Sequence, residues 1–419
     1  MRSAPTMRRS LVALMLITLM LSLSLASAAS STVDVKSEGR ITVEALGLET
    51  AETNPLGDHL LIAGADGFVR IISANSPTDA STAVELQHSN TNTLRDITWH
   101  PAGNTALIAG DSGTVLRYSH EDYALTTVSG TGALESSDIS AIDWRLNGDY
   151  AYLGSASGVI YRYSSSEGFT LLDMSANSAV SAIECHEQLQ LCLATTLSDG
   201  IAIIDRDHDV SWLGSSGDTW VDVDCPDVDL NECVAIASGR RISAIILNEQ
   251  TPASTSIESP VIVGELGGEF VSISIMDDHT VIIEMAPFAL IKFEMDGQKA
   301  YQVLEHATVS EASSTLAGTS LVATWGDDDT HGFMISSDGT VSSFAPPAVE
   351  DDVLMFKAIG VMVMIAVPGT ILGLIYMNSK TLQGWYHGRR NAKREAKKQA
   401  ELDEIKAQKV AERAAKNKK

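Results

Sequence analysis

HLLIAGADGFVRIIS, residues 59–73, places an apolar run, a Gly/Asp turn and a second apolar run within fifteen residues. The same pattern returns as TALIAGDSGTVLRYS at 105–119 and as DYAYLGSASGVIYRYS at 149–164. Four looser copies follow: LCLATTLSDGIAIID at 191–205, CVAIASGRRISAIIL at 233–247, TVIIEMAPFALIKFEM at 280–295 and LVATWGDDDTHGFMIS at 321–336. Seven copies of a strand–turn–strand unit predict a fold built from repeated β-hairpins.

The spacing of the copies indicates which repeat fold this is. The last residues of the first strands are 46, 44, 41, 42, 47 and 41 residues apart, at Gly64, Gly110, Gly154, Thr195, Ala237, Glu284 and Trp325. A period of about 43 residues is the length of a four-stranded propeller blade. We therefore predict an all-β, seven-bladed β-propeller over residues 29–345. A pair of β-sandwich domains is the alternative, but sandwiches do not repeat at this length.

The character of the strands agrees with radial stacking. Runs such as LLIAG, ALIAG and VAIAS are continuously apolar, where a sheet with one solvated face would alternate. A blade covered on both faces by its neighbours requires such strands. Further strands are expected before each pair, as in LRDITWHPAG and ISAIDWRLNG, and after it, as in YALTTVSG and AYQVLEHA.

Residues 98–119, TWHPAGNTALIAGDSGTVLRYS, resemble a WD-repeat unit, in which a strand ending near W-x-P-x-G precedes a strand, a D-x-G turn and another strand. The copy at 142–164 is similar, and SSDGTV at 336–341 repeats the turn. The third strands end in Ile72-Ser73, Tyr118-Ser119 and Tyr163-Ser164 instead of Trp-Asp, and no Gly-His pair opens the unit. The resemblance implies a WD-like propeller, a fold mostly used as a binding platform.

Two apolar segments outside the repeats predict the topology. Arg2, Arg8 and Arg9 precede an uncharged run, and Ala26-Ser27-Ala28 provides a small-x-small cleavage site, so residues 1–28 are predicted to be a secretory signal peptide. An uncleaved anchor is the alternative. Residues 358–379 carry no charge and are long enough for a transmembrane helix, with 346–357 as a linker. By the positive-inside rule we expect a single-pass cell-membrane protein with its propeller outside the cytoplasm.

Charge separates the two sides of that span. The tail, residues 380–419, carries 13 Lys and Arg against 5 acidic residues, and is predicted to be a basic cytoplasmic helix. Its cluster is expected to meet anionic lipid and comprises Arg389, Arg390, Lys393, Arg394, Lys397 and Lys398. Residues 10–379 carry a net charge of −36, which excludes binding to the nucleic-acid backbone. Gly369 and Gly373 form a G-x-x-x-G, a candidate transmembrane dimer face.

The four cysteines occupy equivalent places in adjacent repeats. Cys185 and Cys192 flank the turn that opens the fourth copy, and Cys225 and Cys233 flank the turn that opens the fifth. Antiparallel neighbours are close enough for a disulfide, so we predict the pairs Cys185–Cys192 and Cys225–Cys233. A four-thiolate zinc site is the alternative, and export to an oxidising space opposes it.

No motif identifies a reaction. The chain has no G-x-S-x-G, no H-E-x-x-H and no sialidase-like or quinoprotein repeat signature, so we expect neither catalytic residues nor a cofactor. Calcium is a weak possibility at an acidic loop formed by Asp222, Asp224, Asp227, Asp229 and Glu232, which fails the EF-hand pattern. His208 is expected to lie in a solvated turn.

The sequence therefore predicts a non-enzymatic, membrane-anchored binding protein. Its role would be that of a scaffold, receptor or envelope-complex assembly factor, and we expect its protein partners to be membrane or envelope proteins. A surface propeller that binds or hydrolyses carbohydrate is the alternative, with Trp212 and Trp220 as the clustered aromatic candidates. A solute-capturing lipoprotein is disfavoured because no lipobox cysteine follows the leader.

Overall fold

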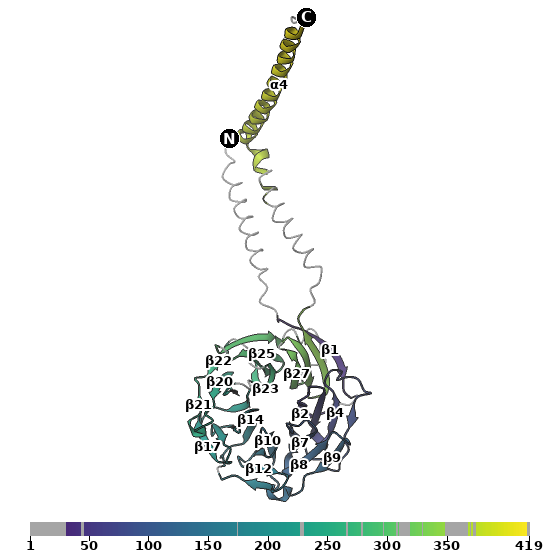
Figure 1. The fold of residues 1–419 in the computed structure, drawn as a ribbon, viewed down its shortest axis with the longest axis vertical. Helices are drawn as coiled ribbons and strands as arrows, with labels where there is room; N and C mark the ends of the chain where they lie inside the picture. Colours follow the sequence, from purple (N-terminus) through teal and green to yellow (C-terminus); the bar gives the residue numbers. More distant parts are fainter. Residues whose placement is uncertain are drawn as a thin grey trace, which may run out of the picture. The chain divides into compact units, whose positions relative to one another are not determined.

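The computed structural model shows seven antiparallel sheets arranged in a ring (Figure 1). The structure describes residues 31–42, 46–173, 175–226, 230–264, 267–277, 280–295, 297–306, 309, 319–328, 330–347, 368, 370–371 and 374–416. The prediction of a seven-bladed β-propeller is confirmed, and the two-sandwich alternative is wrong. Residues 1–347 and 348–419 form separate compact units.

Each blade is an antiparallel sheet that begins with an innermost strand at the axis and ends at the outer edge of the ring. Blades 1 to 3 contain β2 (Leu48–Thr53), β3 (His59–Gly64), β4 (Val69–Ser73) and β5 (Val84–Glu85); β6 (Leu94–Trp99), β7 (Thr105–Gly110), β8 (Thr114–Ser119) and β9 (Ala124–Thr127); and β10 (Ile139–Trp144), β11 (Ala151–Ser155), β12 (Ile160–Ser164) and β13 (Gly168–Leu171). Blades 4 and 5 contain β14 (Val180–Cys185), β15 (Cys192–Thr196), β16 (Ile201–Ile204) and β17 (Val210–Gly214); and β18 (Trp220–Asp224), β19 (Glu232–Ala237), β20 (Arg241–Ile246), β21 (Ser256–Ile257) and β22 (Val261–Ile262). Blades 6 and 7 contain β23 (Glu269–Asp277), β24 (Thr280–Ala286), β25 (Ala289–Glu294) and β26 (Lys299–Leu304); and β27 (Leu321–Asp328), β28 (His331–Ser336), β29 (Thr340–Ala345) and β1 (Asp34–Arg40). Short 3-10 turns lie at η1 (Ala65–Gly67), η2 (Asp111–Gly113), η3 (Thr131–Leu134) and η4 (Pro252–Ser254).

The seventh blade closes the ring with the first strand of the chain. β1 pairs with β29, in a register that places Asp34 opposite Ala345. The sequence repeats begin after this strand, so their period did not reveal it. The predicted hairpin of the seventh copy is also wrong by one strand: Trp325 lies on the first strand, β27, and the hairpin equivalent to the others is β28–β29, around the SSDGT turn.

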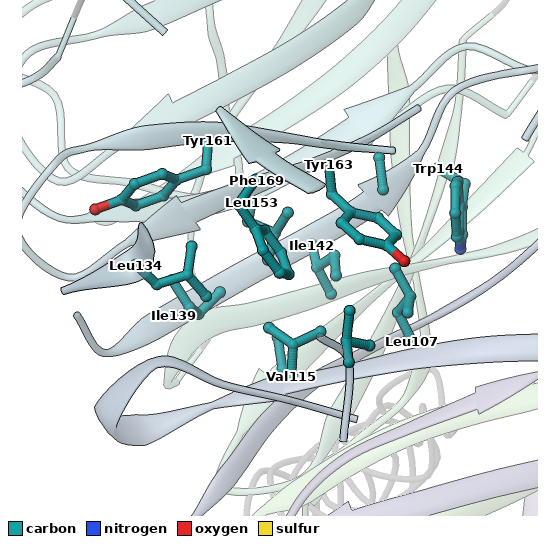
Figure 2. Packing of buried hydrophobic residues seen from close by; sticks show 13 residues of the cluster. Leu107, Val115, Leu134, Ile139, Ile142, Trp144, Leu153, Tyr161, Tyr163 and Phe169 are labelled. Atoms are coloured by element: carbon teal, nitrogen blue, oxygen red, sulfur yellow. The ribbon is translucent and has the colours of Figure 1, made fainter. Parts of the chain in front are cut away.

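Apolar clusters fill all seven junctions between blades. In β7, Leu107 and Ala109 pack toward blade 3, whereas Ala106 and Ile108 pack toward blade 1. Figure 2 shows the junction of blades 2 and 3, where Leu107 and Val115 meet Trp144, Tyr163 and other residues of the next blade. Covering both faces explains why these strands are continuously apolar, as the sequence predicts.

Glycine ends the second strand in blades 1 and 2 because backbone passes close to it. A Cβ on Gly110 would lie 2.2 Å from the carbonyl oxygen of Thr93, and one on Gly64 would lie 2.2 Å from that of Gly47. The recurring IAG of the sequence thus marks the end of the second strand, which lies against the residue just before the first strand of the same blade.

The second unit contains the helix α4 (Lys380–Lys416). Within the described residues, no helix is both long and apolar enough to cross a membrane. The leader lies outside the described residues, as do most of the expected span at 358–379 and both Gly369 and Gly373.

Candidate functional site

The first strands of the blades surround the axis of the ring. Each contacts the first strand of the next blade, and β27 contacts β2 to complete the circle (Figure 1). All seven strands share one irregularity: a β-bulge directly after the first or, in blade 6, the second paired residue, as between Leu94 and Asp96. A repeated bulge sets the same side chains toward the axis in every blade.

Acidic residues occupy these axial positions in five consecutive blades. They lie two or four residues after the start of the strand, and a further one reaches the axis from the second strand of blade 6. We call them the axis carboxylates: Glu52, Asp96, Asp143, Glu184, Asp222, Asp224 and Glu284. Asp224 and Glu284 are buried and the other five, which border the axis, are half-buried.

Three axis carboxylates connect one blade to the next. The Oδ2 atom of Asp96 accepts the Ile142 N–H at 2.8 Å, and Oδ2 of Asp222 accepts the Ile273 N–H at 2.8 Å. Asp143 does the same with the N–H of Cys185, at 2.7 Å. The innermost strand of a sheet has an unpaired edge, so its N–H groups need acceptors. These carboxylates supply them across the blade junctions.

Asp143 is the most fully bonded of the three. Its Oδ1 atom also accepts the Trp144 N–H at 2.8 Å and the Thr98 hydroxyl at 2.8 Å. Thr98 belongs to β6 and Cys185 to β14, so a single carboxylate bonds to the first strands on both sides of its own. Its loss would leave several polar groups without partners.

Burial and mutual repulsion disfavour ionisation at the axis. Burial raises the pKa of Asp96 to about 8 and the pKa values of Asp143 and Asp222 to about 7. Burial, followed by the charge of Asp143, raises the pKa of Glu52 and of Glu184 well above its ordinary range. Within the described part of the chain, no ion pair involves an axis carboxylate. The axis is thus an acidic space that holds protons near neutral pH.

In blade 6, two serine hydroxyl groups of the first strand donate to the axis carboxylate. Ser272 donates to Glu284 Oε2 at 2.6 Å and Ser274 donates to Oε1 at 3.1 Å. Burial raises the pKa of Glu284, and the hydrogen bond from Ser272 opposes that shift.

Histidines connect the turns that follow the first strands. His186 is buried; its Nδ1 accepts the Gln188 and Leu189 N–H groups, so Nε2 carries the proton and donates to the Leu230 carbonyl at 2.7 Å. His100 is placed similarly, with Nε2 3.2 Å from the Gly148 carbonyl of the next blade. These turns are therefore joined between blades 2 and 3 and between blades 4 and 5.

The predicted disulfides are confirmed. Cys185–Cys192 and Cys225–Cys233 join the first and second strands of blades 4 and 5, and the zinc alternative is wrong. The next residues, His186 and Leu191, are hydrogen-bonded to each other, so Cys185 and Cys192 form a non-hydrogen-bonded pair, which leaves the Cys185 N–H available to Asp143.

The residues considered for metal binding lie in different surroundings from those that the sequence predicts. Of the acidic loop considered for calcium, Asp222 and Asp224 belong to the axis, whereas Asp227 and Asp229 lie outside the described residues. The described residues contain no group of three or more side chains able to hold a metal ion. His208 lies in a turn, as expected, but its ring is partly covered: it packs edge-on against Tyr150, and Nδ1 lies 2.7 Å from the Tyr152 hydroxyl.

The aromatic pair proposed for sugar binding does not form a platform. Trp220 is buried, with its Nε1 donating to the Ser215 carbonyl, and Trp212 packs partly buried against the junction of blades 3 and 4. Their proximity in sequence reflects the packing of successive strands. On α4, the basic cluster that begins at Arg389 is exposed along the helix.

The comparison with solved structures finds proteins of similar fold. No protein family and no curated protein matches the sequence. Among solved structures, the β-propeller domain of Cps50 (Swd1) from Myceliophteria thermophila matches with a TM-score of 0.56 and 13% identity, covering 74% of this chain and 98% of that one. A structure of YCF48 bound to D1 peptide matches with a TM-score of 0.55 and 10% identity, covering 76% of this chain and 98% of that one. At such low identity this likeness shows the fold alone, and it agrees with the propeller seen in the sheet topology.

Proposed function

We propose that this protein is a membrane-anchored scaffold that binds a protein partner on the turns around the axis of its propeller. The observation that carries the proposal is the closed ring itself: seven apolar junctions and the β1–β29 pairing fix the blades, leaving the connecting turns as the variable surface. One similar structure is of a propeller bound to a peptide. We extend that mode of use to this chain as a proposal.

The proposed location follows from the sequence. A signal peptide at 1–28, a span at 358–379 and a basic tail would place the propeller outside the cytoplasm, attached to the cell membrane by one helix. Because Asp34 lies opposite Ala345, both ends of the propeller leave from adjacent strands of one blade. Dimerisation through Gly369 and Gly373 remains a prediction.

The acidic character of the propeller indicates which partners it can bind. The propeller contains only three lysines, Lys36, Lys292 and Lys299, among many carboxylates. Partners that present lysine or arginine are favoured, and polyanions are repelled. The carbohydrate alternative has lost its aromatic pair, because Trp220 is buried. We propose a binding role without catalysis.

Cross-linking mass spectrometry on the native membrane tests this proposal. Because lysines are so few, the reagent should join carboxylates on the propeller to amines on the partner. We expect reproducible cross-links from the turn residues to one partner protein. A solitary protein that turns over a glycan would contradict the proposal.

A matched pair of variants locates the contact. Leu56 is 78% exposed in the turn between β2 and β3, and Leu171 is 58% exposed on the outer strand β13. Leu56→Asp should reduce the cross-links, whereas Leu171→Asp should leave them unchanged. The reverse result would place the partner on the outer edge of the ring.

A further inference from the structure

The two halves of helix α4 differ in net charge. Residues 380–398 contain seven basic residues and a single acidic one, Glu395. Residues 399–416 contain four basic and four acidic residues. In the second half the charges compensate, as in the Lys406–Asp403 pair at 3.9 Å. The first half is therefore a concentrated positive surface.

Aromatic residues lie at the start of that positive surface. Trp385 is 62% exposed and Tyr386 is 51% exposed. The guanidinium of Arg389 lies over the Trp385 ring, 5.2 Å from its centroid. Exposed tryptophan and tyrosine beside arginine and lysine are the combination found where helices meet the headgroup region of a bilayer.

The helix has no apolar face that its own unit covers. Every residue from 384 to 409 is exposed, so tertiary packing contributes little there. The helix therefore depends on local propensity, and a binding surface would add to its stability. Because the first half of α4 is positively charged, the surface that binds it should be anionic.

We propose that residues 380–398 of α4 dock on the surface of an anionic lipid bilayer, with Trp385 and Tyr386 in the headgroup region and the basic residues against lipid phosphates. A nucleic acid would match the charge alone. The exposed aromatic pair next to the cations favours the bilayer. The proposal deepens the membrane location proposed above but does not require a transmembrane span, because docking uses only α4.

The test uses the full-length protein with a single reporter on the helix. All four cysteines are paired in disulfides, so Asn391→Cys introduces the one reactive thiol, to which an environment-sensitive NBD dye is attached. The protein is incorporated into nanodiscs of phosphatidylcholine alone or with about 30% phosphatidylglycerol. We expect the NBD emission to shift to the blue only in the anionic discs, and the shift to disappear at high salt.

Two variants remove four positive charges each. The first replaces Arg389, Arg390, Lys393 and Arg394 with Gln, and the second replaces Lys406, Lys409, Arg413 and Lys416 with Gln. The first should lower the ratio of docked to free helix at least about tenfold, because each basic residue near an anionic surface contributes substantially to binding. The second should lower it far less. Equal losses would mean that only net charge matters and would overturn the proposal.

Separate readouts distinguish this proposal from the anchoring proposal. Retention of the protein on phosphatidylcholine discs reports anchoring, whereas the dye reports docking of α4. Retention without any shift in anionic discs would refute the docking and leave the anchor intact. An equal shift on adding a DNA duplex without lipid would show that α4 binds polyanions generally, and would also refute it.

Discussion

The blade junctions and the axis of the ring are built from opposite kinds of residue. At the junction of blades 2 and 3, Leu107, Val115 and Ile142 lie in a cluster of apolar and aromatic side chains. On the first strands of the same two blades, Asp96 and Asp143 are surrounded by backbone and by other carboxylates. The junctions bury apolar side chains, whereas the axis removes from water carboxylates that water would solvate.

The difference shows where the stability of the fold originates. Apolar burial at seven junctions supplies the favourable free energy. The axis carboxylates add directional bonds between blades but carry an electrostatic cost that rises as they ionise. A ring held at its junctions can tolerate that cost at its centre, and the two regions should respond differently to mutation and to pH.

Breaking the last junction should have the largest effect. Val35 of β1 is 8% exposed and packs between blades 6 and 7, whereas the neighbouring Lys36 side chain is 78% exposed. Val35→Asp would bury an unpaired charge in the closing strand and lower the free energy of unfolding by about 3–5 kcal/mol. Lys36→Asp should change it little. Chemical denaturation measures both, and equal effects would mean that β1 does not close the ring.

Removing an inter-blade bond at the axis should have the next largest effect. Asp143→Leu leaves the Cys185 and Trp144 N–H groups and the Thr98 hydroxyl without their acceptor, at a net cost of about 3 kcal/mol. Asp149→Leu, at an exposed position of the same blade, is the control. If Asp143→Leu unfolds at the denaturant concentration of the unmodified protein, the carboxylate is not a structural acceptor.

Opening a disulfide should have a smaller effect. Replacing Cys225 and Cys233 with Ser releases a short closed loop, which the chain-entropy account values at about 2 kcal/mol. A second variant replaces all four cysteines with Ser and so lacks both bridges. Reductant should lower the melting temperature of the unmodified protein to that of this variant. A reductant effect that persists in that variant would contradict the assignment.

The junctions could be predicted from the sequence, whereas the axis largely could not. Continuous apolar runs such as LLIAG recur at a constant period, because each blade must cover both neighbours. The period misses β1 because that strand belongs to a blade whose other strands lie about 300 residues later in the chain. It also misplaces the seventh hairpin, because the segment before β27 is longer than in the other repeats.

The axis carboxylates carried one signal that could have been found. Aligning the first strands shows acidic residues two or four positions after the strand begins, at Asp96, Asp143, Glu184 and Asp222. In a domain with so many acidic residues, a single Asp or Glu in the sequence is interpreted as a surface residue. Only the bulge that repeats in the first strand of all seven blades shows that these point inward.

The pH dependence of unfolding tests the central claim, that the ring buries uncompensated carboxylates at its axis. Their folded pKa values lie above those of the unfolded chain, so the folded state binds more protons and its stability should fall as pH rises from about 4 to about 8. Carboxylates with lowered pKa values, such as Asp328, act only at lower pH. We therefore predict a lower melting temperature at pH 8.5 than at pH 5.5.

The decisive measurement compares Glu184→Gln with Glu121→Gln at these two pH values. Glu184 lies at the axis, where burial and the charge of Asp143 raise its pKa, and Glu121 is an exposed turn residue. Glu184→Gln should reduce the fall in melting temperature and be more stable than the unmodified protein at pH 8.5. Glu121→Gln should follow the unmodified protein. Identical pH profiles for all three proteins would contradict an axis of buried, partly protonated carboxylates.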